Sequence, residues 1–284
     1  MSFSSKWPIF SRGFWFVIIS LCFLIFVLFP FYWMTISALK PNTELFLSPP
    51  TWFPSRIVWE NLINPWRIFP LARYFANSLF VTGITVAATV VLASMAGYSL
   101  SRVGFRGSKL IILLLLICQL LPGIVTIVPF YFWMYRLGLV NKYSGLILAY
   151  IAWTLPFSTL MLRAYFGSAY PVELEEAAMI DGCSRMGAYL RIAMPLSIPG
   201  MVAVGAYVFM LAWKEFMWAS IMLSSGSKKP LAVGLRDLIG EAGQVEFISE
   251  FMAASVAATI PAFLLFFLAQ KYIASGITAG SIKA

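Results

Sequence analysis

Residues 173–199, ELEEAAMIDGCSRMGAYLRIAMPLSIP, form a polar insert between two long apolar runs, and the rest of the chain is organised around it. The insert contains Glu173, Glu175, Glu176 and Asp181, which are four of the eleven acidic residues. A carboxylate within the hydrocarbon of a bilayer costs on the order of 3 kcal/mol even on permissive insertion scales. We therefore expect the insert to lie outside the membrane that the apolar runs would occupy, as a docking element.

The composition is typical of an integral membrane protein. Of the 284 residues, 61% are hydrophobic and only 11% are charged, and the mean hydropathy is +0.87. A soluble globular domain carries a far more charged surface. The net charge of +9 comes from basic residues dispersed between apolar runs, so membrane lipids are the expected neighbours and nucleic acid is not an expected partner. Cys22, Cys118 and Cys183 are too widely separated to indicate a disulfide framework or a metal site.

Six segments are long enough to cross a membrane as helices, which requires roughly 20 apolar residues for a core of about 30 Å. They are residues 14–37, 77–101, 110–134, 144–167, 200–223 and 251–272. Prolines at positions 122, 129, 156 and 261 interrupt the third, fourth and sixth segments and predict bends in those helices. The predicted fold class is all-α, a polytopic membrane protein with six transmembrane helices in one domain over residues 1–284.

Basic residues at the short flanks indicate the orientation. Lys6 and Arg12 precede the first predicted span, and residues 101–109 form a short basic loop. Such flanks favour the cytoplasmic side, so the amino terminus is predicted to be cytoplasmic. The proline- and tryptophan-rich connection 38–76 and the polar connection 224–250 would then lie on the outer side, the first as an ordered loop at the membrane surface.

The first half of the insert has the pattern of a short helix that ends at a glycine. Pro171 suits a first helical position, with Ser168 or Tyr170 near the cap, and the glutamates that follow complement the helix dipole. Gly182 can adopt the left-handed conformation that ends a helix, so this one is predicted to stop near Ile180 or Asp181.

A second short helix is predicted over residues 184–194, closed by Pro195 and Pro199. A helix, a glycine turn and a second helix can fit a partner's groove. The alternative is an ordinary solvated loop, because glutamates near a helix start often do no more than complement the dipole.

The order of residues within the insert resembles the EAA motif of binding-protein-dependent ABC importer permeases. That motif is EAA, three residues, Gly, nine residues, Ile, one residue, Leu, Pro. Here it is matched by Glu176, Ala177, Ala178, Gly182, Ile192 and Pro195, while Met194 replaces the usual Leu. PPTWFP at 49–54, LGLVNKYSGLILAY at 137–150 and MAASVAATIPA at 252–262 are similar to the sugar-importer, maltose-permease-like branch.

The resemblance implies a set of partners. The loop at 168–199, including Asp181, would be cytoplasmic and would couple the chain to a dimer of ATP-binding subunits. A second homologous permease would complete the translocation pathway, and an extracytoplasmic solute-binding protein would deliver a sugar. Both termini would be cytoplasmic, in a prokaryotic inner membrane. The chain has no GK pair and hence no Walker A loop, so it is expected to be no enzyme, with ATP and Mg²⁺ on partner subunits and no cofactor or metal of its own.

The segment WKEFMW at 213–218 places two charges near the middle of the fifth predicted span. Ionisable residues within a membrane usually face a cavity or a partner, so Lys214 and Glu215 are candidates for lining the substrate pathway. On one continuous helix, Tyr207, Leu211, Lys214 and Trp218 would share a face suited to stacking on sugar rings. The alternative is that the span ends earlier and Lys214 extends to the outer interface.

Two other classes of function are weaker alternatives. An intramembrane enzyme is disfavoured because the chain contains no histidine, which removes H-E-x-x-H metal chemistry and Ser-His-Asp triads. A secondary transporter would be expected to carry inverted repeats and its own coupling site, and no convincing pair of halves is present.

Overall fold

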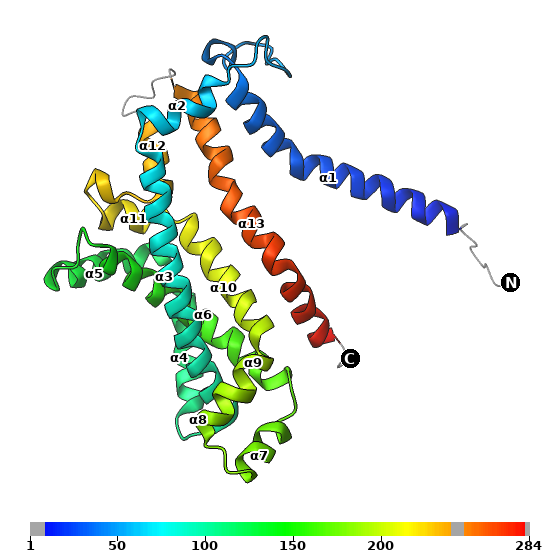
Figure 1. The fold of residues 1–284 in the computed structure, drawn as a ribbon, viewed down its shortest axis with the longest axis vertical. Coiled ribbons are helices and arrows are strands. Elements are labelled where there is room, and N and C mark those ends of the chain that lie inside the picture. The colour runs from blue at the N-terminus through cyan, green and yellow to red at the C-terminus, as the bar shows by residue number, and fades with distance from the viewer. Residues whose placement is uncertain (1–8, 240–246, 282–284) are drawn as a thin grey trace. The chain divides into compact units, whose positions relative to one another are not determined.

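The computed structural model of the chain describes residues 9–239 and 247–281. Within these ranges the chain is helical and contains no strand (Figure 1). Four helical segments are long and apolar enough to cross a membrane: Gly13–Leu39, Leu71–Val103, Tyr143–Ser168 and Ile248–Tyr272. Two bent helix pairs meet the same criterion, which gives up to six spans. The predicted all-α membrane fold is confirmed.

The helices occur in the following order: α1 (Ile9–Leu39), α2 (Glu60–Ile68), α3 (Leu71–Tyr98), α4 (Ser108–Leu120), α5 (Gly123–Arg136), α6 (Tyr143–Ser168), α7 (Glu173–Ile180), α8 (Arg185–Ala188), α9 (Met194–Leu196), α10 (Ile198–Trp213), α11 (Met217–Met222), α12 (Leu231–Ile239) and α13 (Ile248–Ser281). Two π-helical turns, η2 (Ser99–Val103) and η3 (Tyr189–Ala193), extend α3 and connect α8 to α9. Short 3-10 turns occur at η1 (Asn42–Glu44) and η4 (Gly226–Lys228).

The third predicted span is two helices rather than one. α4 and α5 meet at an angle of 104°. Pro122 is the residue before α5 and has no N–H to continue the hydrogen bonding of α4, so the predicted bend at this proline is confirmed. Pro129 lies within α5 and does not end it.

The fifth predicted span, residues 200–223, is wrong as a single helix. α10 ends at Trp213, Lys214 is its C-terminal cap, and α11 begins only at Met217. The prediction that Tyr207, Leu211, Lys214 and Trp218 share one helical face is therefore also wrong, because a common face requires an unbroken helix. At its other end α10 is bent by 73° from the helical segment Arg185–Leu196.

The chain divides into two compact units, Met1–Pro70 with Asp237–Ala257, and Leu71–Arg236 with Ala258–Ala284. In the first unit, Lys40 is buried and connects α1 to the loop that follows it. Its ammonium donates to the carbonyl of Thr51 and lies 4.8 Å from the centre of the Trp33 ring. The Asn61 amide donates to the carbonyl of Lys40 at 2.8 Å. These bonds explain why a proline-rich connection forms an ordered loop. The prediction of one domain over residues 1–284 stays a prediction.

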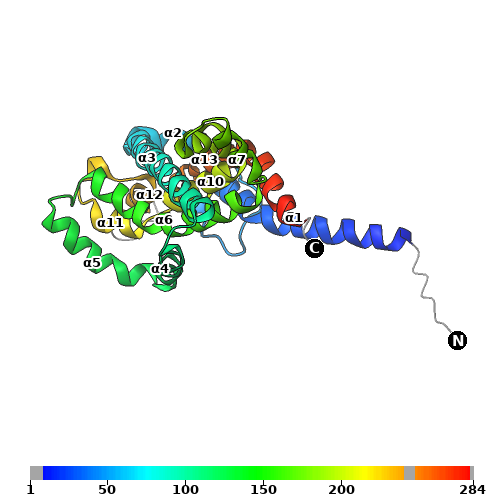
Figure 2. The same ribbon diagram turned by 90° about the horizontal axis from the view of Figure 1, so that it is seen from below.

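The second unit is built on α3, which packs against α6 and α10. The approach of α3 to α6 is close: a Cβ added at Gly97 would lie 2.8 Å from the backbone nitrogen of Arg163. Thr89 and Thr154 lie hydroxyl to hydroxyl at 3.3 Å across the same interface. Small and hydroxyl-bearing residues let membrane helices approach closely, so the chain uses packing and hydrogen bonds here. Figure 2 shows the same helices from below.

Candidate functional site

The polar insert folds as a helix, a glycine turn and a second helical arm (Figure 1). α7 ends at Ile180, and Gly182 has a φ of +88°, the left-handed conformation that favours glycine. Ser184 caps α8, and its hydroxyl accepts a hydrogen bond from the N–H of Gly187 at 3.1 Å. The predicted helix, turn and second helix are confirmed in outline.

The ends of these helices differ from the prediction. α7 begins after Val172, with no side-chain hydrogen bond at its cap, so Pro171 precedes the helix and neither Ser168 nor Tyr170 caps it. Ser168 is instead the last residue of α6. The second arm is α8, the π-helical turn η3 and α9, rather than one α-helix, and Pro195 lies within α9. Proline is tolerated there because the first turn of a helix does not use that N–H.

A buried glutamate that the motif does not include fixes α7 to its neighbours. Glu175 is 3% exposed, and its carboxylate accepts hydrogen bonds from the hydroxyls of Tyr98 at 2.5 Å and Tyr170 at 2.7 Å. Arg102 Nε lies 3.5 Å from the same carboxylate. We call Tyr98, Arg102, Tyr170 and Glu175 the Glu175 cluster. A buried carboxylate requires such partners, since an unpaired charge in the interior is strongly destabilising.

Arg102 also binds the end of α6. Its Nη2 donates to the carbonyls of Phe166 at 2.5 Å and Tyr170 at 2.8 Å, and its guanidinium lies 4.7 Å from the centre of the Tyr170 ring. A cation is favoured at a helix C-terminus, just as Glu175 is favoured in the first turn of α7. The pKa of Tyr170 is raised mainly by burial and secondly by the hydrogen bond from its hydroxyl to Glu175. The hydroxyl is therefore protonated at neutral pH and donates to the carboxylate.

The second arm of the insert is attached to α3 through Tyr189. Its hydroxyl lies 2.8 Å from that of Ser94, and its ring packs 4.9 Å from the ring of Tyr98. All three side chains are buried. Both arms are thus held by the last turns of α3 and by η2, a link that motif spacing does not reveal.

The residues of the motif itself lie on the outside of this arrangement. Glu176, Ala177, Asp181, Gly182 and Pro195 are exposed, and Ala178 and Ile192 are partly buried. Large apolar side chains lie beside them, with Ile180 86% exposed and Leu174, Met186 and Leu190 about half exposed. Apolar side chains on a polar segment outside a bilayer are typical of a protein-binding surface.

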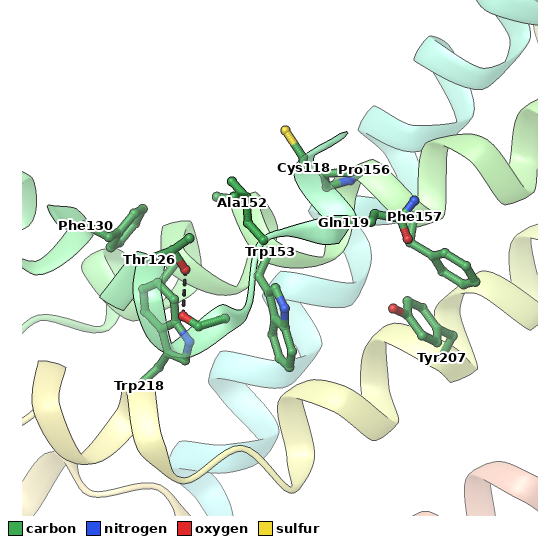
Figure 3. Close-up of a pocket in the computed structure, with 13 residues that line it drawn as sticks. Cys118, Gln119, Thr126, Phe130, Ala152, Trp153, Pro156, Phe157, Tyr207 and Trp218 are labelled. Carbon is green, nitrogen blue, oxygen red and sulfur yellow. Dashed lines mark hydrogen bonds between the residues drawn. The ribbon is translucent and has the colours of Figure 1, made fainter. Parts of the chain in front are cut away.

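A separate pocket of about 390 Å³ opens at the break between α4 and α5 (Figure 3). Aromatic pairs define two of its edges: the rings of Phe157 and Tyr207 lie 4.7 Å apart, and those of Phe130 and Trp218 lie 5.2 Å apart. The complete lining is Cys118, Gln119, Leu121, Gly123, Thr126, Phe130, Ala149, Ala152, Trp153, Pro156, Phe157, Tyr207 and Trp218. Among the residues that the structure describes, none of charged type lines this pocket.

The structure brings only two of the five predicted pathway residues to the pocket. Tyr207 enters from α10 and Trp218 from α11. Leu211, Lys214 and Glu215 do not line it. Trp153, Phe157 and Phe130 were missed because the sequence shows only aromatic residues in apolar runs. Pro122 predicts a bend there, but neither its angle of 104° nor the side chains that line the pocket beside it.

Glu215 is a buried cap rather than a free intramembrane charge. It is 8% exposed and accepts hydrogen bonds from the hydroxyl of Tyr150 at 2.9 Å and from the N–H groups of Trp218 at 2.8 Å and Ala219 at 3.0 Å. Its carboxylate thus satisfies the first N–H groups of α11. Lys214 is exposed beside it, at the end of α10. Within residues 9–239 and 247–281, no group of three or more His, Cys, Asp or Glu side chains is placed to hold a metal ion.

The polar insert lies within the part of the chain that matches a known family. The model of the family described as "Binding-protein-dependent transport system inner membrane component" matches residues 89–279, which include the whole insert. The chain belongs to this family. Its members are inner-membrane permeases, so the predicted class of transport protein is confirmed and neither the enzyme nor the secondary-transporter alternative is supported.

Relatives match over nearly the whole chain. The inner membrane ABC transporter permease protein YcjP of Escherichia coli is 36% identical over 92% of this chain and 93% of its own length. The trehalose/maltose transport system permease protein MalG of Thermococcus litoralis is 36% identical over 91% and 92%. A chain of a bacterial ABC transporter involved in alginate import has a TM-score of 0.81 at 20% identity, covering 96% of this chain and 99% of that one, which supports the fold.

Proposed function

We propose that this chain is a permease subunit of an ATP-driven sugar importer, in which the polar insert docks an ATP-binding subunit. The observation that carries the proposal is the arrangement of the insert. One side is held by the buried Glu175 cluster, and the other presents Glu176 among exposed apolar side chains. An ordinary solvated loop requires neither the rigid attachment nor the exposed apolar surface.

The family implies the rest of the assembly. A dimer of ATP-binding subunits would hold ATP and Mg²⁺, because this chain has no Walker A loop. A second homologous permease would form the other half of the pathway, and an extracytoplasmic solute-binding protein would deliver the sugar. With six spans and the insert facing the ATP-binding subunits, both termini would lie in the cytoplasm, which agrees with the cytoplasmic amino terminus that the basic flanks predict.

The pocket at the break between α4 and α5 is the proposed sugar path within this subunit. It combines aromatic rings with Gln119 and Thr126 and is lined by residues that are uncharged. Aromatic faces with a few polar groups suit the C–H face and hydroxyls of a neutral sugar. Several relatives are also named for sugar transport, including permeases of trehalose/maltose and diacetylchitobiose systems.

The docking proposal is tested by ATP-driven uptake in vesicles that contain the permease with its partner subunits and solute-binding protein. The substrates are radiolabelled neutral mono- and disaccharides that include trehalose and maltose. Glu176→Lys reverses an exposed charge on α7 and is expected to abolish uptake while the chain still inserts. Glu60→Lys reverses another exposed charge, on α2, and is the matched control that should retain uptake. Normal uptake by Glu176→Lys would refute the docking role, and no ATP-driven uptake of any sugar by the wild type would refute the function.

The pathway proposal is tested by removing one aromatic wall of the pocket. Trp153→Ala is expected to raise the KM for the transported sugar about tenfold, because one stacked ring contributes on the order of 1 kcal/mol or slightly more. Trp133→Ala removes a 60% exposed tryptophan of α5 that does not line the pocket, and its KM should be unchanged. Equal effects of the two variants would contradict this assignment of the path.

A further inference from the structure

α3 is not joined in sequence to the polar insert, which is connected directly only to α6 and α10. It is nevertheless the helix to which both arms of the insert are bonded. We propose that α3 is the element that carries motion of the docked insert to the outer loop at 225–231, with Tyr98 and Asn77 as positioning residues at its two ends. This inference rests on the proposed function.

The cytoplasmic end of α3 holds the insert through residues spaced four apart. Ser94 pairs with Tyr189 of the second arm, Tyr98 donates to Glu175 of the first arm, and Arg102 faces the same carboxylate. Residues at this spacing lie on one side of a helix, so one face of α3 and η2 contacts both arms of the insert. Displacement of either arm therefore displaces the same two turns.

These bonds are costly to break, which makes them suited to transmitting a movement. The hydroxyls of Tyr98 and Tyr189 and the Glu175 carboxylate belong to buried residues, so separating them would leave polar groups without water or a partner. The ring of Tyr98 adds packing against Phe166 at 5.6 Å and against Tyr189. We expect the insert and this end of α3 to move as one body.

The other end of α3 holds the loop that precedes α12. The Asn77 amide donates to the carbonyls of Ser227 at 3.0 Å and Lys229 at 2.9 Å, and its oxygen accepts from the hydroxyl of Tyr143 at 2.8 Å. The hydroxyl of Ser78 accepts from the N–H of Leu231 at 2.7 Å. Within the proposed orientation this loop lies on the side from which the sugar arrives.

The helix between these two ends is continuous and well supported. It is α-helical from Leu71 to Tyr98 with no internal proline, and a helix rises about 1.5 Å per residue, so Asn77 and Tyr98 are roughly 32 Å apart along the axis. α3 packs against α6 and α10. α4 with α5, and α10 with α11, are broken and less able to carry a push from one end to the other. α6 is also unbroken, but it is joined in sequence to the first arm alone, whereas α3 is hydrogen-bonded to both arms.

The test compares the two ends of α3 with its middle in the complete reconstituted transporter. The readout is the number of sugar molecules transported per ATP hydrolysed, measured on purified, fully assembled complexes with the panel sugar that the wild type transports. Ser94→Ala/Tyr98→Phe weakens the inner end while keeping the ring, and Asn77→Leu removes the outer bonds with little change in size. Each is expected to lower this ratio about tenfold, the effect of losing a hydrogen bond to a charged or buried partner.

The control is Thr85→Val in the middle of α3, where a buried hydroxyl donates to the carbonyl of Val81 on the same helix and, among the described residues, to no other element. Its ratio should match the wild type. The variant that combines both end changes should have the same ratio as the single-end variant with the lower ratio. The reason is that both ends serve one path, so once one end is broken the second change has nothing further to interrupt.

An unchanged ratio in the assembled inner-end and outer-end variants would overturn the inference, as would independent, multiplying effects of the two ends. If the inner double variant does not assemble, Tyr98→Phe alone replaces it with the same expectation. Failure of the function itself would be seen separately, as a wild-type complex without ATP-driven uptake.

Discussion

Glu175 and Glu215 are both buried glutamates at polar interruptions of apolar sequence, and the structure uses them in different ways. Glu175 joins three parts of the chain, because its partners come from the end of α3, from η2 and from the α6–α7 connection. Glu215 acts largely on its own surroundings, because two of its three partners are backbone N–H groups of α11. The first is an attachment between elements, and the second is a local cap with one bond to Tyr150 of α6.

The comparison shows that a charge in an apolar run has more than one explanation. The charge of Glu215 in an apolar run suggests a substrate contact and the acidic insert suggests docking, yet the carboxylates of Glu175 and Glu215 both accept hydrogen bonds within the chain. What differs is the number of elements that depend on each. We therefore expect a change at Glu175 to be felt across the second unit, and a change at Glu215 to remain near α11.

The largest effect should come from Glu175→Ala. It leaves the largely buried Arg102 side chain beside two tyrosine hydroxyls without the carboxylate, and breaking a buried pair in this way costs about 3–5 kcal/mol. The expected results are lower thermal stability of the purified permease in detergent and faster hydrogen exchange in α7, η2 and the end of α6 together. Exchange that rises in α7 alone would indicate that Glu175 is only a local residue.

Glu215→Ala should have a smaller and more local effect. Loss of an N-terminal cap costs about 0.5–2 kcal/mol, with a further contribution from the Tyr150 hydroxyl that loses its acceptor. Hydrogen exchange should rise in α11 and leave α7 unchanged. If hydrogen exchange in α7 rose as much in Glu215→Ala as in Glu175→Ala, it would contradict the assignment of Glu215 as a local cap.

The pH dependence of Tyr170 should sharpen the comparison further. Its pKa is raised by burial and by its hydrogen bond to Glu175, so the bond is fully present below the ordinary tyrosine pKa of about 10 and is lost as pH rises through the higher value in the folded protein. The difference in ultraviolet tyrosinate absorbance between wild type and Tyr170→Phe should therefore develop above pH 10. Glu175→Gln should move this ionisation to lower pH, because the negative neighbour is gone.

The smallest effect is expected for Lys214→Ala. Lys214 lies between the end of α10 and Glu215. Unlike Glu215 it is exposed, and it does not line the pocket. The KM for the transported sugar and the uptake rate should stay at wild-type values. A changed sugar preference would restore Lys214 to the substrate path.

The sequence predicted the membrane fold and the insert because both depend on local properties. Long apolar runs indicate spans, and the left-handed turn at Gly182 follows from the residue type itself. The two helix breaks differ in how well the sequence predicts them. Pro122 indicates the break at Leu121, but no proline or glycine lies between Trp213 and Met217 to indicate the break at Lys214.

The Glu175 cluster was beyond sequence reasoning for a related reason. Glu173, Glu175 and Glu176 are equivalent as helix-starting acids, and only tertiary packing decides which one is buried. The partners of Glu175 come from positions 98, 102 and 170, and their spacing in the sequence does not indicate that they share a site. The motif led instead to Glu176, the exposed neighbour of the buried residue.

Photo-crosslinking from α7 tests the central claim most directly. A photoreactive amino acid is placed at Ile180, which is 86% exposed at the tip of the insert, and in a separate chain at Leu113, which is exposed on the apolar helix α4. In the assembled transporter, illumination should join the Ile180 variant to the ATP-binding subunit and should not do so for the Leu113 variant. A complex that transports sugar but gives no such product from Ile180 would contradict docking through the polar insert.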